Sequence, residues 1–295
     1  MIDFCGIPLA HRVLNGSGTF DAIAARRAFG DALLEQFPFA AFVSKTVTLE
    51  PRQGNPPPRL YELPAGMINS IGLPNKGLHG YLEEDLPRLA ELPVPLIVNV
   101  MGSTPGEVAR LVQAFAERDE VAALELNVSC PNVHTGLTMG ADPNELAALL
   151  DAVRPHTDKP LIVKLTPNCT SPADVAAAAE QHGADAVSLM NTLRGTAMHD
   201  GEPWLGAITG GVSGPAIRAI ALSQVSDVRA RTTLPIVGMG GVQDGRHAQD
   251  LIDAGADLVA VGTESFRDPL AGARVAAELE GSPANAARAV AGSRA

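Results

Sequence analysis

Two of the four lysines in this chain follow short apolar segments, which is an unusual place for a cation. Lys45 comes after AAFVS, and Lys164 comes after LIV. A lysine in an apolar strand loses hydration, so it is expected to meet an anion or an electron-rich ring. Lys45 and Lys164 are therefore candidate binding residues, and the alternative chemistry for either of them is that of a Schiff-base nucleophile.

Glycine-rich phrases end two other apolar segments, IVGMGGV at 236–242 and VAVGT at 259–263. Glycines at such places let backbone N–H groups approach a phosphate, and a following helix N-terminus favours the negative charge. The sequence has no Walker motif, and no G-x-G-x-x-G phrase opens the chain, so flavin mononucleotide (FMN) is favoured over ATP as a phosphate-bearing ligand. The alternative is that these glycines only serve tight turns.

Cys130 lies in the phrase LNVSCPN at 126–132, just after the fourth apolar segment. Amides and a hydroxyl flank it, whereas no histidine does, which argues against a papain-like nucleophile. A thiol there can act as a general base toward an activated carbon acid. The alternative is a buried small side chain, which is the role expected for Cys5 and Cys169.

Four asparagines also lie near the ends of apolar segments or in the long connection that follows the second one: Asn69, Asn127, Asn132 and Asn191. An amide offers both a donor and an acceptor, so a group of amides matches the alternating N–H and C=O edge of an imide or pyrimidine ring. This pattern predicts a planar heterocyclic substrate. The alternative is asparagine used in turns.

Eight apolar segments alternate with helix-like segments and must position these side chains. The strand-like segments are 13–19, 41–48, 96–102, 122–128, 161–165, 186–190, 235–239 and 258–262, and the clearest helix-like ones are 105–117, 143–153, 171–181, 215–230 and 245–254. This alternation predicts a parallel sheet covered on both faces. Eight strands favour a single-domain (β/α)8 TIM barrel over residues 1–295, with its active site at the carboxyl ends of the strands. The segment 49–77 is expected to be a long irregular, functional connection, or alternatively a tolerated insertion.

Composition excludes several classes of protein. The 295 residues carry 22 Lys+Arg and 33 Asp+Glu, a net charge of −11, with no basic cluster, so neither nucleic acid nor an anionic membrane is expected as a partner. Three scattered cysteines and no histidine motif predict no zinc, iron–sulfur or other metal site within this chain, and they fit a reducing compartment. Without an apolar span or a signal-peptide pattern, we expect a soluble cytoplasmic protein.

Several phrases together resemble the dihydroorotate dehydrogenase family over nearly the whole chain. They are NGSGTF (15–20), SKTVTLEPRQGNPPPR (44–59), MINSIGLPNKG (67–77), ELNVSCPN (125–132), VKLTPN (163–168), MNTLRG (190–195), TGGVSGPA (209–216) and GMGGV (238–242). The resemblance implies a (β/α)8 barrel that holds FMN and oxidises dihydroorotate to orotate in pyrimidine biosynthesis.

The resemblance also implies roles for individual residues. Cys130 would take a proton from C5 of dihydroorotate while C6 delivers hydride to the flavin, and Lys164 would stabilise the reduced flavin. FMN contacts are implied at Ser17, Lys45, Thr46, Asn99, Asn127, Lys164, Met190, Gly214, Gly240, Gly241, Gly262 and Thr263. Substrate contacts are implied at Lys45, Asn69, Ser70, Ile71, Gly72, Leu73, Asn127, Asn132, Asn191 and Thr192.

Cysteine rather than serine at Cys130 is similar to class 1 of the family, and EPRQGNPPPR, MNTL and TGGVSGPA are more similar to its subclass B. Subclass B implies a homodimer at the core of a heterotetramer, with an FAD and iron–sulfur subunit that passes electrons to NAD. The rivals are the fumarate-using subclass A, a reductase of the dihydropyrimidine dehydrogenase kind, a Schiff-base aldolase and a non-enzymatic barrel that binds a phosphorylated ligand. Two departures are Gly16, where the family more often has alanine, and a shortened lid segment at 133–141.

Overall fold

Eight parallel strands form one sheet in the structure, a computed structural model that describes residues 1–129 and 139–281. The strand order is β3-β16-β15-β10-β9-β8-β7-β4, so the first strand pairs with the last, as in a (β/α)8 barrel. The strands are β3 (Val13–Asn15), β4 (Phe42–Val43), β7 (Leu96–Val100), β8 (Ala123–Asn127), β9 (Leu161–Lys164), β10 (Ala186–Leu189), β15 (Ile236–Met239) and β16 (Leu258–Val261). Each lies within a predicted strand-like segment, so the predicted fold is confirmed.

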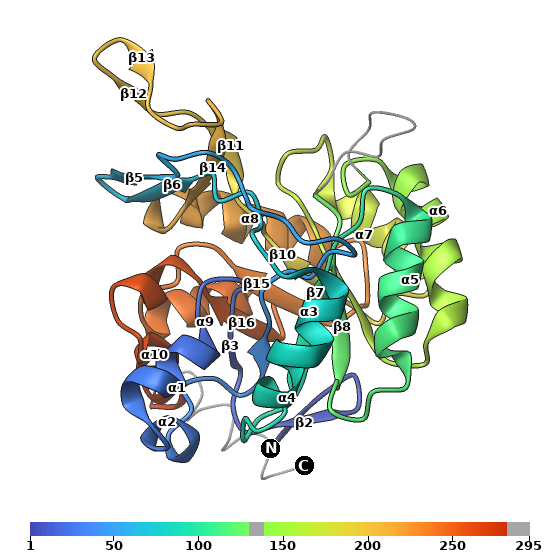
Figure 1. The fold of residues 1–295 in the computed structure, drawn as a ribbon. Coiled ribbons are helices and arrows are strands. Elements are labelled where there is room, and N and C mark those ends of the chain that lie inside the picture. Colours follow the sequence, from blue (N-terminus) through green and yellow to red (C-terminus); the bar gives the residue numbers. More distant parts are fainter. Residues whose placement is uncertain (130–138, 282–295) are drawn as a thin grey trace.

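Helices connect consecutive barrel strands and surround the sheet (Figure 1). They are α1 (Ala22–Phe29), α2 (Ala32–Glu35), α3 (Gly77–Gly80), the π turn η1 (Tyr81–Asp85), α4 (Leu86–Leu89), α5 (Pro105–Ala116), α6 (Pro143–Val153), the 3-10 turn η2 (Arg154–His156), α7 (Pro172–Gln181), the 3-10 turn η3 (Pro215–Ile217), α8 (Arg218–Arg229), α9 (Gly245–Asp253), the 3-10 turn η4 (Thr263–Phe266) and α10 (Ala271–Glu280). Thr104, Asp142 and Ser171 each accept a backbone N–H at the start of a helix, with proline in the first turn. None of the helices among the described residues is sufficiently long and apolar to traverse a membrane.

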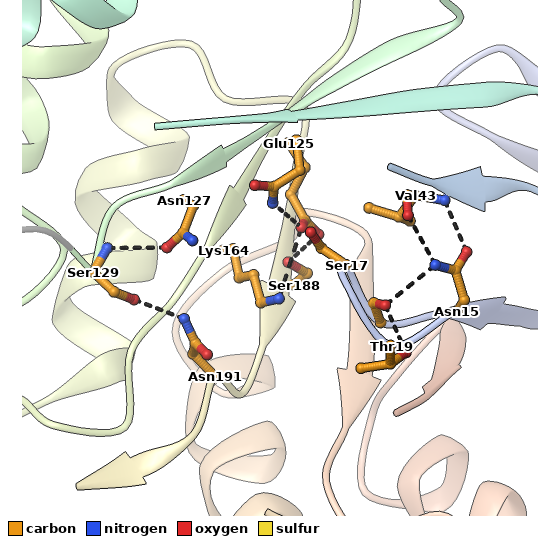
Figure 2. A network of polar contacts seen from close by, with 12 residues as sticks. Asn15, Ser17, Thr19, Val43, Glu125, Asn127, Ser129, Lys164, Ser188 and Asn191 are labelled. Carbon is orange, nitrogen blue, oxygen red and sulfur yellow. Dashed lines mark hydrogen bonds and ion pairs between the residues drawn. The ribbon is translucent and has the colours of Figure 1, made fainter. Parts of the chain in front are cut away.

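Side-chain hydrogen bonds join β3 to β4, the two strands at the ends of the sheet order. The backbone N–H of Ala40 donates to the carbonyl oxygen of Val13 at 2.9 Å. The side chain of the buried Asn15 then takes the place of a strand partner: its Nδ2 donates to the Val43 carbonyl oxygen and its Oδ1 accepts the Val43 N–H, both at 2.8 Å (Figure 2). An asparagine amide reproduces the donor and acceptor pair of a peptide, so the cylinder closes at this position.

Alternate residues of the strands contribute to two apolar clusters, one on each face of the sheet. The cluster under the helices includes Val98, Leu124, Val163, Leu111 and Leu146. The cluster inside the barrel includes Leu14, Val43, Ile97, Ala123, Ile162, Ala186, Val237 and Leu258, together with Phe4, Ile7 and Leu9. The last three belong to an antiparallel hairpin, β1 (Ile2–Phe4) and β2 (Ile7–Leu9), which covers the end of the barrel where the parallel strands begin (Figure 1).

The segment 49–77 is not irregular throughout, which corrects the sequence-based expectation. It contains β5 (Leu60–Leu63) and β6 (Gly66–Asn69), which join β11 (Leu193–Gly195) and β14 (Gly210–Ser213) in an antiparallel sheet of order β11-β14-β6-β5. This four-stranded sheet stands over one end of the barrel, and the hairpin of β12 (Met198–His199) and β13 (Glu202–Pro203) projects beyond it (Figure 1). Its strands come from distant parts of the sequence, and β14 begins with two glycines, so a local apolar pattern does not reveal it.

The phrases HGADAV (182–187) and AGADLV (254–259) form two equivalent turns from a helix into a strand. Gly183 and Gly255 adopt φ values of +84° and +119° after a helix, which glycine accommodates without strain. Two residues later an aspartate, Asp185 or Asp257, accepts at 2.8 Å the backbone N–H at the start of the preceding strand in the sheet. Each aspartate also pairs with an arginine from the helix region behind it, Arg154 at 2.8 Å and Arg229 at 3.5 Å.

Candidate active site

Polar side chains replace the apolar ones at the carboxyl end of the barrel interior. On β7, β8, β9 and β10, the positions that follow the inward apolar layer are Asn99, Glu125, Lys164 and Ser188. All four residues are buried, with at most 7% of their surface exposed. Register places them together, because Asn99 pairs with Glu125 and Ser188 pairs with Lys164 across neighbouring strands. Sequence reasoning predicted Asn99 and Lys164 here.

Glu125 is the functional candidate that sequence reasoning missed. Its Oε1 accepts a hydrogen bond from Asn99 Nδ2 at 2.5 Å, and its Oε2 accepts one from Ser188 Oγ at 2.9 Å. Lys164 Nζ lies 3.9 Å from Oε1, which makes an ion pair whose two side chains are 8% and 4% exposed (Figure 2). A charged residue between Leu124 and Leu126 was the sequence pattern that could have revealed it, since the alternation directs Glu125 into the barrel.

Asn99 carries an unused acceptor in this cluster. Its Oδ1 is buried, and no hydrogen-bond partner for it exists among the described residues. A buried polar atom without a partner costs free energy, so such an atom in a native site points to a ligand or a water that satisfies it.

The asparagines predicted to bind the substrate are joined through Ser129. Its backbone N–H donates to Asn127 Oδ1 at 3.3 Å, and Asn191 Nδ2 donates to Ser129 Oγ at 2.8 Å (Figure 2). Asn191 Oδ1 in turn accepts the backbone N–H of Thr192 at 2.8 Å. The structure therefore brings Asn127, Asn191 and Thr192 into one group, and Ser129 is a connecting residue that sequence reasoning did not single out.

Asn69 is the last residue of β6, and Ser70 to Leu73 follow it in the loop that leads to α3. Asn69 Nδ2 donates to the carbonyl oxygen of Gly211 at 3.3 Å, and Ser70 is buried and accepts from Asn55 Nδ2 through its hydroxyl at 3.0 Å. Gly72 has a φ of +75°, and a Cβ there would lie 2.5 Å from the backbone nitrogen of Asn55. The loop geometry thus depends on this glycine. The remaining two residues of the predicted set are Ile71 and Leu73, both partly exposed.

The β3 and β4 side of the barrel holds the predicted residues Ser17, Lys45 and Thr46. Ser17 Oγ donates to the carbonyl oxygen of Ser44 at 2.8 Å. Thr46 is buried, whereas Lys45 is exposed and lines a cleft of about 410 Å³ between α1 and the η1–α4 segment. The two predicted lysines therefore differ: Lys164 is buried with a carboxylate partner, and Lys45 faces open space.

Close backbone approach brings together the predicted glycines after β15, β16 and β14. Gly214, Gly240 and Gly241 have φ values of +91°, +136° and +71°. A Cβ on Gly241 would lie 3.0 Å from the carbonyl oxygen of Gly214, and one on Gly214 would lie 3.4 Å from Cγ2 of Thr263. Thr263 Oγ1 also donates to Ser213 Oγ at 2.9 Å. The result is a backbone-lined cradle at the starts of η3 and η4, which suits a phosphate group.

Other predicted residues fall around or outside these groups. Met190 is buried, with its side chain 3.7 Å from the position of a Cβ on Gly240, and Gly262 precedes Thr263. Cys130 and Asn132 lie outside the described residues, as does most of the segment 133–141.

Burial raises the pKa of Cys5 to about 11 and raises that of Cys169, which fits unreactive thiols. Within the described ranges, no group of three histidine, cysteine or carboxylate side chains is placed to hold a metal ion.

Sequence comparison relates this chain to known proteins of one family. A sequence profile of the dihydroorotate dehydrogenase family matches residues 2–282. The chain is 44% identical over 283 residues to the protein named dihydroorotate dehydrogenase B (NAD(+)), catalytic subunit, of Pelobacter propionicus, a match that covers 95% of this chain and 91% of that protein. Identity to the protein of the same name from Desulforudis audaxviator is 44% over 285 residues, with the same coverage of both chains. The protein of that name from Geobacter sulfurreducens is 41% identical, again over 95% of this chain and 91% of its own length. The chain belongs to the dihydroorotate dehydrogenase family.

Proposed function

We propose that this chain is the FMN-containing catalytic subunit of a dihydroorotate dehydrogenase, and that it oxidises dihydroorotate to orotate as a single-domain barrel. The observation that carries the proposal is the buried Lys164, which lies among Asn99, Glu125 and Ser188 at the carboxyl end of the barrel. Family membership and the names of the curated relatives support the same reaction.

The described residues fit FMN on two independent observations. Asn99 Oδ1 is a buried acceptor in need of a partner, and the positive φ values of Gly214, Gly240 and Gly241 fold the backbone into close turns of the kind that surround a phosphate. Lys164 would lie at the ring system, and Ser17, Thr46, Asn127, Met190, Gly262 and Thr263 would complete the contacts. Bound FMN would supply the acceptor for a hydride from dihydroorotate.

The substrate would be held by the amide group of Asn127 and Asn191, with Asn69 above it and Lys45 at the carboxylate. The connection through Ser129 keeps Asn127 and Asn191 at fixed orientations, which favours recognition of a planar ring with alternating donors and acceptors. Asn132 and the loop Ser70 to Leu73 would add contacts at the rim. Cys130 would act as the general base that removes the proton from C5 of the substrate.

The electron acceptor is proposed to be NAD, reached through a partner subunit that carries FAD and an iron–sulfur cluster. Three cysteines in the whole chain do not make up the four thiolates that such a cluster uses, so the cluster would belong to the partner. The relatives at 41–44% identity are named as catalytic subunits of an NAD(+) enzyme, which supports this route over fumarate. We propose further that two copies of this chain form a homodimer, that this homodimer is the core of a heterotetramer with the partner subunit, and that the enzyme works in the cytoplasm.

The decisive experiment is an absorbance spectrum of the purified chain, followed by anaerobic addition of dihydroorotate. We expect a flavin spectrum that bleaches with dihydroorotate and not with dihydrouracil, and release of FMN on denaturation. FAD, or no flavin after reconstitution, would refute the cofactor. Bleaching by dihydrouracil instead would assign a dihydropyrimidine reductase, and strong fumarate turnover by the isolated chain would replace the NAD route. Adding the partner subunit should then confer NAD reduction.

A further inference from the structure

Glu125 is a buried carboxylate for which the proposed reaction has no direct use. It is 3% exposed, and it belongs to a strand whose neighbouring residues Leu124 and Leu126 face the helices. A carboxylate in such a place is retained only if hydrogen bonds and an opposite charge replace its lost hydration. Glu125 has both, which indicates that its charge is used at this position.

Two neutral donors fix the carboxylate. Asn99 Nδ2 donates to Oε1 at 2.5 Å from β7, and Ser188 Oγ donates to Oε2 at 2.9 Å from β10. Because the two donors hold different oxygens from opposite sides, Glu125 cannot turn toward or away from the centre of the barrel. Its negative charge is therefore stationary, in contrast to that of a surface carboxylate.

Lys164 forms an ion pair with this carboxylate but no hydrogen bond to it. Its Nζ lies 3.9 Å from Glu125 Oε1, beyond the usual length of a hydrogen bond, and within residues 1–129 and 139–281 it makes no hydrogen bond. In register, Lys164 pairs with Asn127, whereas Glu125 is two residues deeper along β8. Lys164 is thus two residues nearer the carboxyl end of the barrel than the fixed anion that it faces.

We propose that Glu125 is a positioning residue that restrains the ammonium group of Lys164 and compensates part of its charge. This inference rests on the proposed FMN site, where Lys164 meets the ring system. A restrained, partly compensated cation stabilises a reduced, anionic ring less than a free cation does. Glu125 therefore holds the reduction potential of the bound flavin below the value that Lys164 alone would produce, which favours onward transfer to a weakly oxidising acceptor.

The test is a double-mutant cycle on the full-length flavoprotein with Glu125→Gln and Lys164→Ala. Glu125→Gln keeps the side-chain volume and removes the charge. We expect it to tighten reduced FMN relative to oxidised FMN by at least about tenfold, which is a rise of about 30 mV for a two-electron couple. In the Lys164→Ala background the same substitution should change this ratio by less than about threefold, because the cation through which Glu125 acts is gone.

Two further variants separate charge from structure. Glu125→Asp keeps the charge but withdraws it from Lys164 by one methylene, so it should raise the ratio by less than Glu125→Gln does. It serves as the readout if Glu125→Gln does not fold, and an unchanged ratio would then overturn the proposal. Ser188→Ala removes one hydrogen bond to the same carboxylate and no charge, so its effect should be much smaller than that of Glu125→Gln. An equal shift in both Lys164 backgrounds, a fall in potential, or no shift would overturn the proposal.

A second readout does not depend on the flavin. The apoprotein is treated with acetic anhydride, and the acetylation rate of Lys164 is measured by peptide mass spectrometry. Acetylation requires the amino group to leave the ion pair and reach the reagent, which a fixed carboxylate opposes, so Glu125→Gln should react at least threefold faster. Equal rates would overturn the restraint by Glu125, whereas a wild-type protein that binds no FMN would refute only the proposed function.

Discussion

Asn15 and Val43 form two reciprocal hydrogen bonds of 2.8 Å, one in each direction between the Asn15 amide and the Val43 backbone. Both residues are buried, Asn15 at 0% exposure and Val43 at 4%. The Asn15 side chain therefore replaces the backbone hydrogen bonds of a strand pair at the junction between β3 and β4. The Val43 N–H and carbonyl groups that it satisfies are buried and have no access to water.

Replacing Asn15 by alanine should therefore destabilise the whole barrel. The substitution leaves a buried N–H and a buried carbonyl of Val43 without partners, which costs about 2–4 kcal/mol in the free energy of unfolding. Urea unfolding followed by circular dichroism measures this change. Asn144, an exposed asparagine on α6, is the matched control, and its alanine variant should stay within about 0.5 kcal/mol of the parent. Equal stability of the two variants would contradict the role of Asn15.

Lys164→Ala should weaken FMN binding and lower the reduction potential of the flavin. Loss of a charge-assisted contact costs about 1.5–3 kcal/mol, which is roughly a 10- to 150-fold rise in Kd. The melting temperature should also fall, because Glu125 loses its cation. Fluorescence titration of the apoprotein with FMN and a spectroscopic redox titration give both quantities. Lys159→Ala, two residues before the start of β9, is the control, and an unchanged Kd and potential in Lys164→Ala would refute this role.

Gly241→Ala should reduce the affinity for FMN by more than its effect on stability explains. Gly241 has a φ of +71°, and an added Cβ would approach the Gly214 carbonyl oxygen to 3.0 Å inside the predicted phosphate cradle. Gly201 has a φ of +86° with nothing within 4 Å of the added Cβ, so Gly201→Ala has the backbone strain without the crowding. Backbone strain should cost each variant about 1–2 kcal/mol of stability, and the crowding should cost Gly241→Ala more. Only Gly241→Ala should bind FMN at least about tenfold more weakly by fluorescence titration, and equal affinities would contradict the cradle.

His11 should make the protein less stable in mild acid. Burial lowers the pKa of His11 from its ordinary 6.5, against an opposing effect of Glu280, and its Nδ1 accepts the backbone N–H of Val13 at 3.2 Å. The unfolded chain therefore takes up the proton first, so stability that is present above pH 6.5 is lost as the pH falls through the pKa of the folded state. Melting temperatures between pH 7.5 and 5 should fall less steeply for His11→Gln than for the parent. The exposed His156→Gln should keep the parental slope, and a steep slope in His11→Gln would count against the argument.

Cys130 should determine the pH dependence of flavin reduction, a prediction that comes from the sequence alone. A thiol base must lose its proton to act, so reduction by dihydroorotate should accelerate toward a pKa in the thiol range. Cys130→Ala should lower the rate by roughly 10²–10⁴-fold while the flavin and orotate still bind. Cys130→Ser should retain slightly more activity at high pH. Stopped-flow bleaching across a pH series compares the three proteins, and a wild-type rate in Cys130→Ala would assign the base elsewhere.

Local patterns predicted the barrel well, because its strands are short apolar runs that end in recognisable polar residues. Lys164 and Asn127 could be placed at the carboxyl ends from the sequence, since parallel strands share that edge. Glu125 was missed because its role depends on which face of β8 it occupies, and it acts through residues of three other strands. Ser129 was missed for a similar reason, as it connects two asparagines that are 64 residues apart (191 − 127).

The four-stranded sheet could not be predicted from local sequence patterns. β6 pairs with β5, its neighbour in the sequence, but also with β14, through the pair Ile68 and Val212. β14 has no strong strand pattern of its own, because it begins with Gly210 and Gly211. The glycines are explained by packing, since a Cβ on Gly211 would fall 1.9 Å from Thr192 Oγ1. Only the three-dimensional arrangement makes that requirement visible.

The pairing of β3 with β16, in which Val13 lies opposite Val259, also constrains how the chain acquires its structure. On the ribosome, the first strand and the β1–β2 hairpin emerge long before the strand that completes their environment. The interior cluster that Phe4 and Leu9 share with Leu258 therefore stays exposed until synthesis has passed β16. Formation of the native barrel is consequently a late, non-local event, and the nascent chain presents apolar surface to chaperones for most of its synthesis.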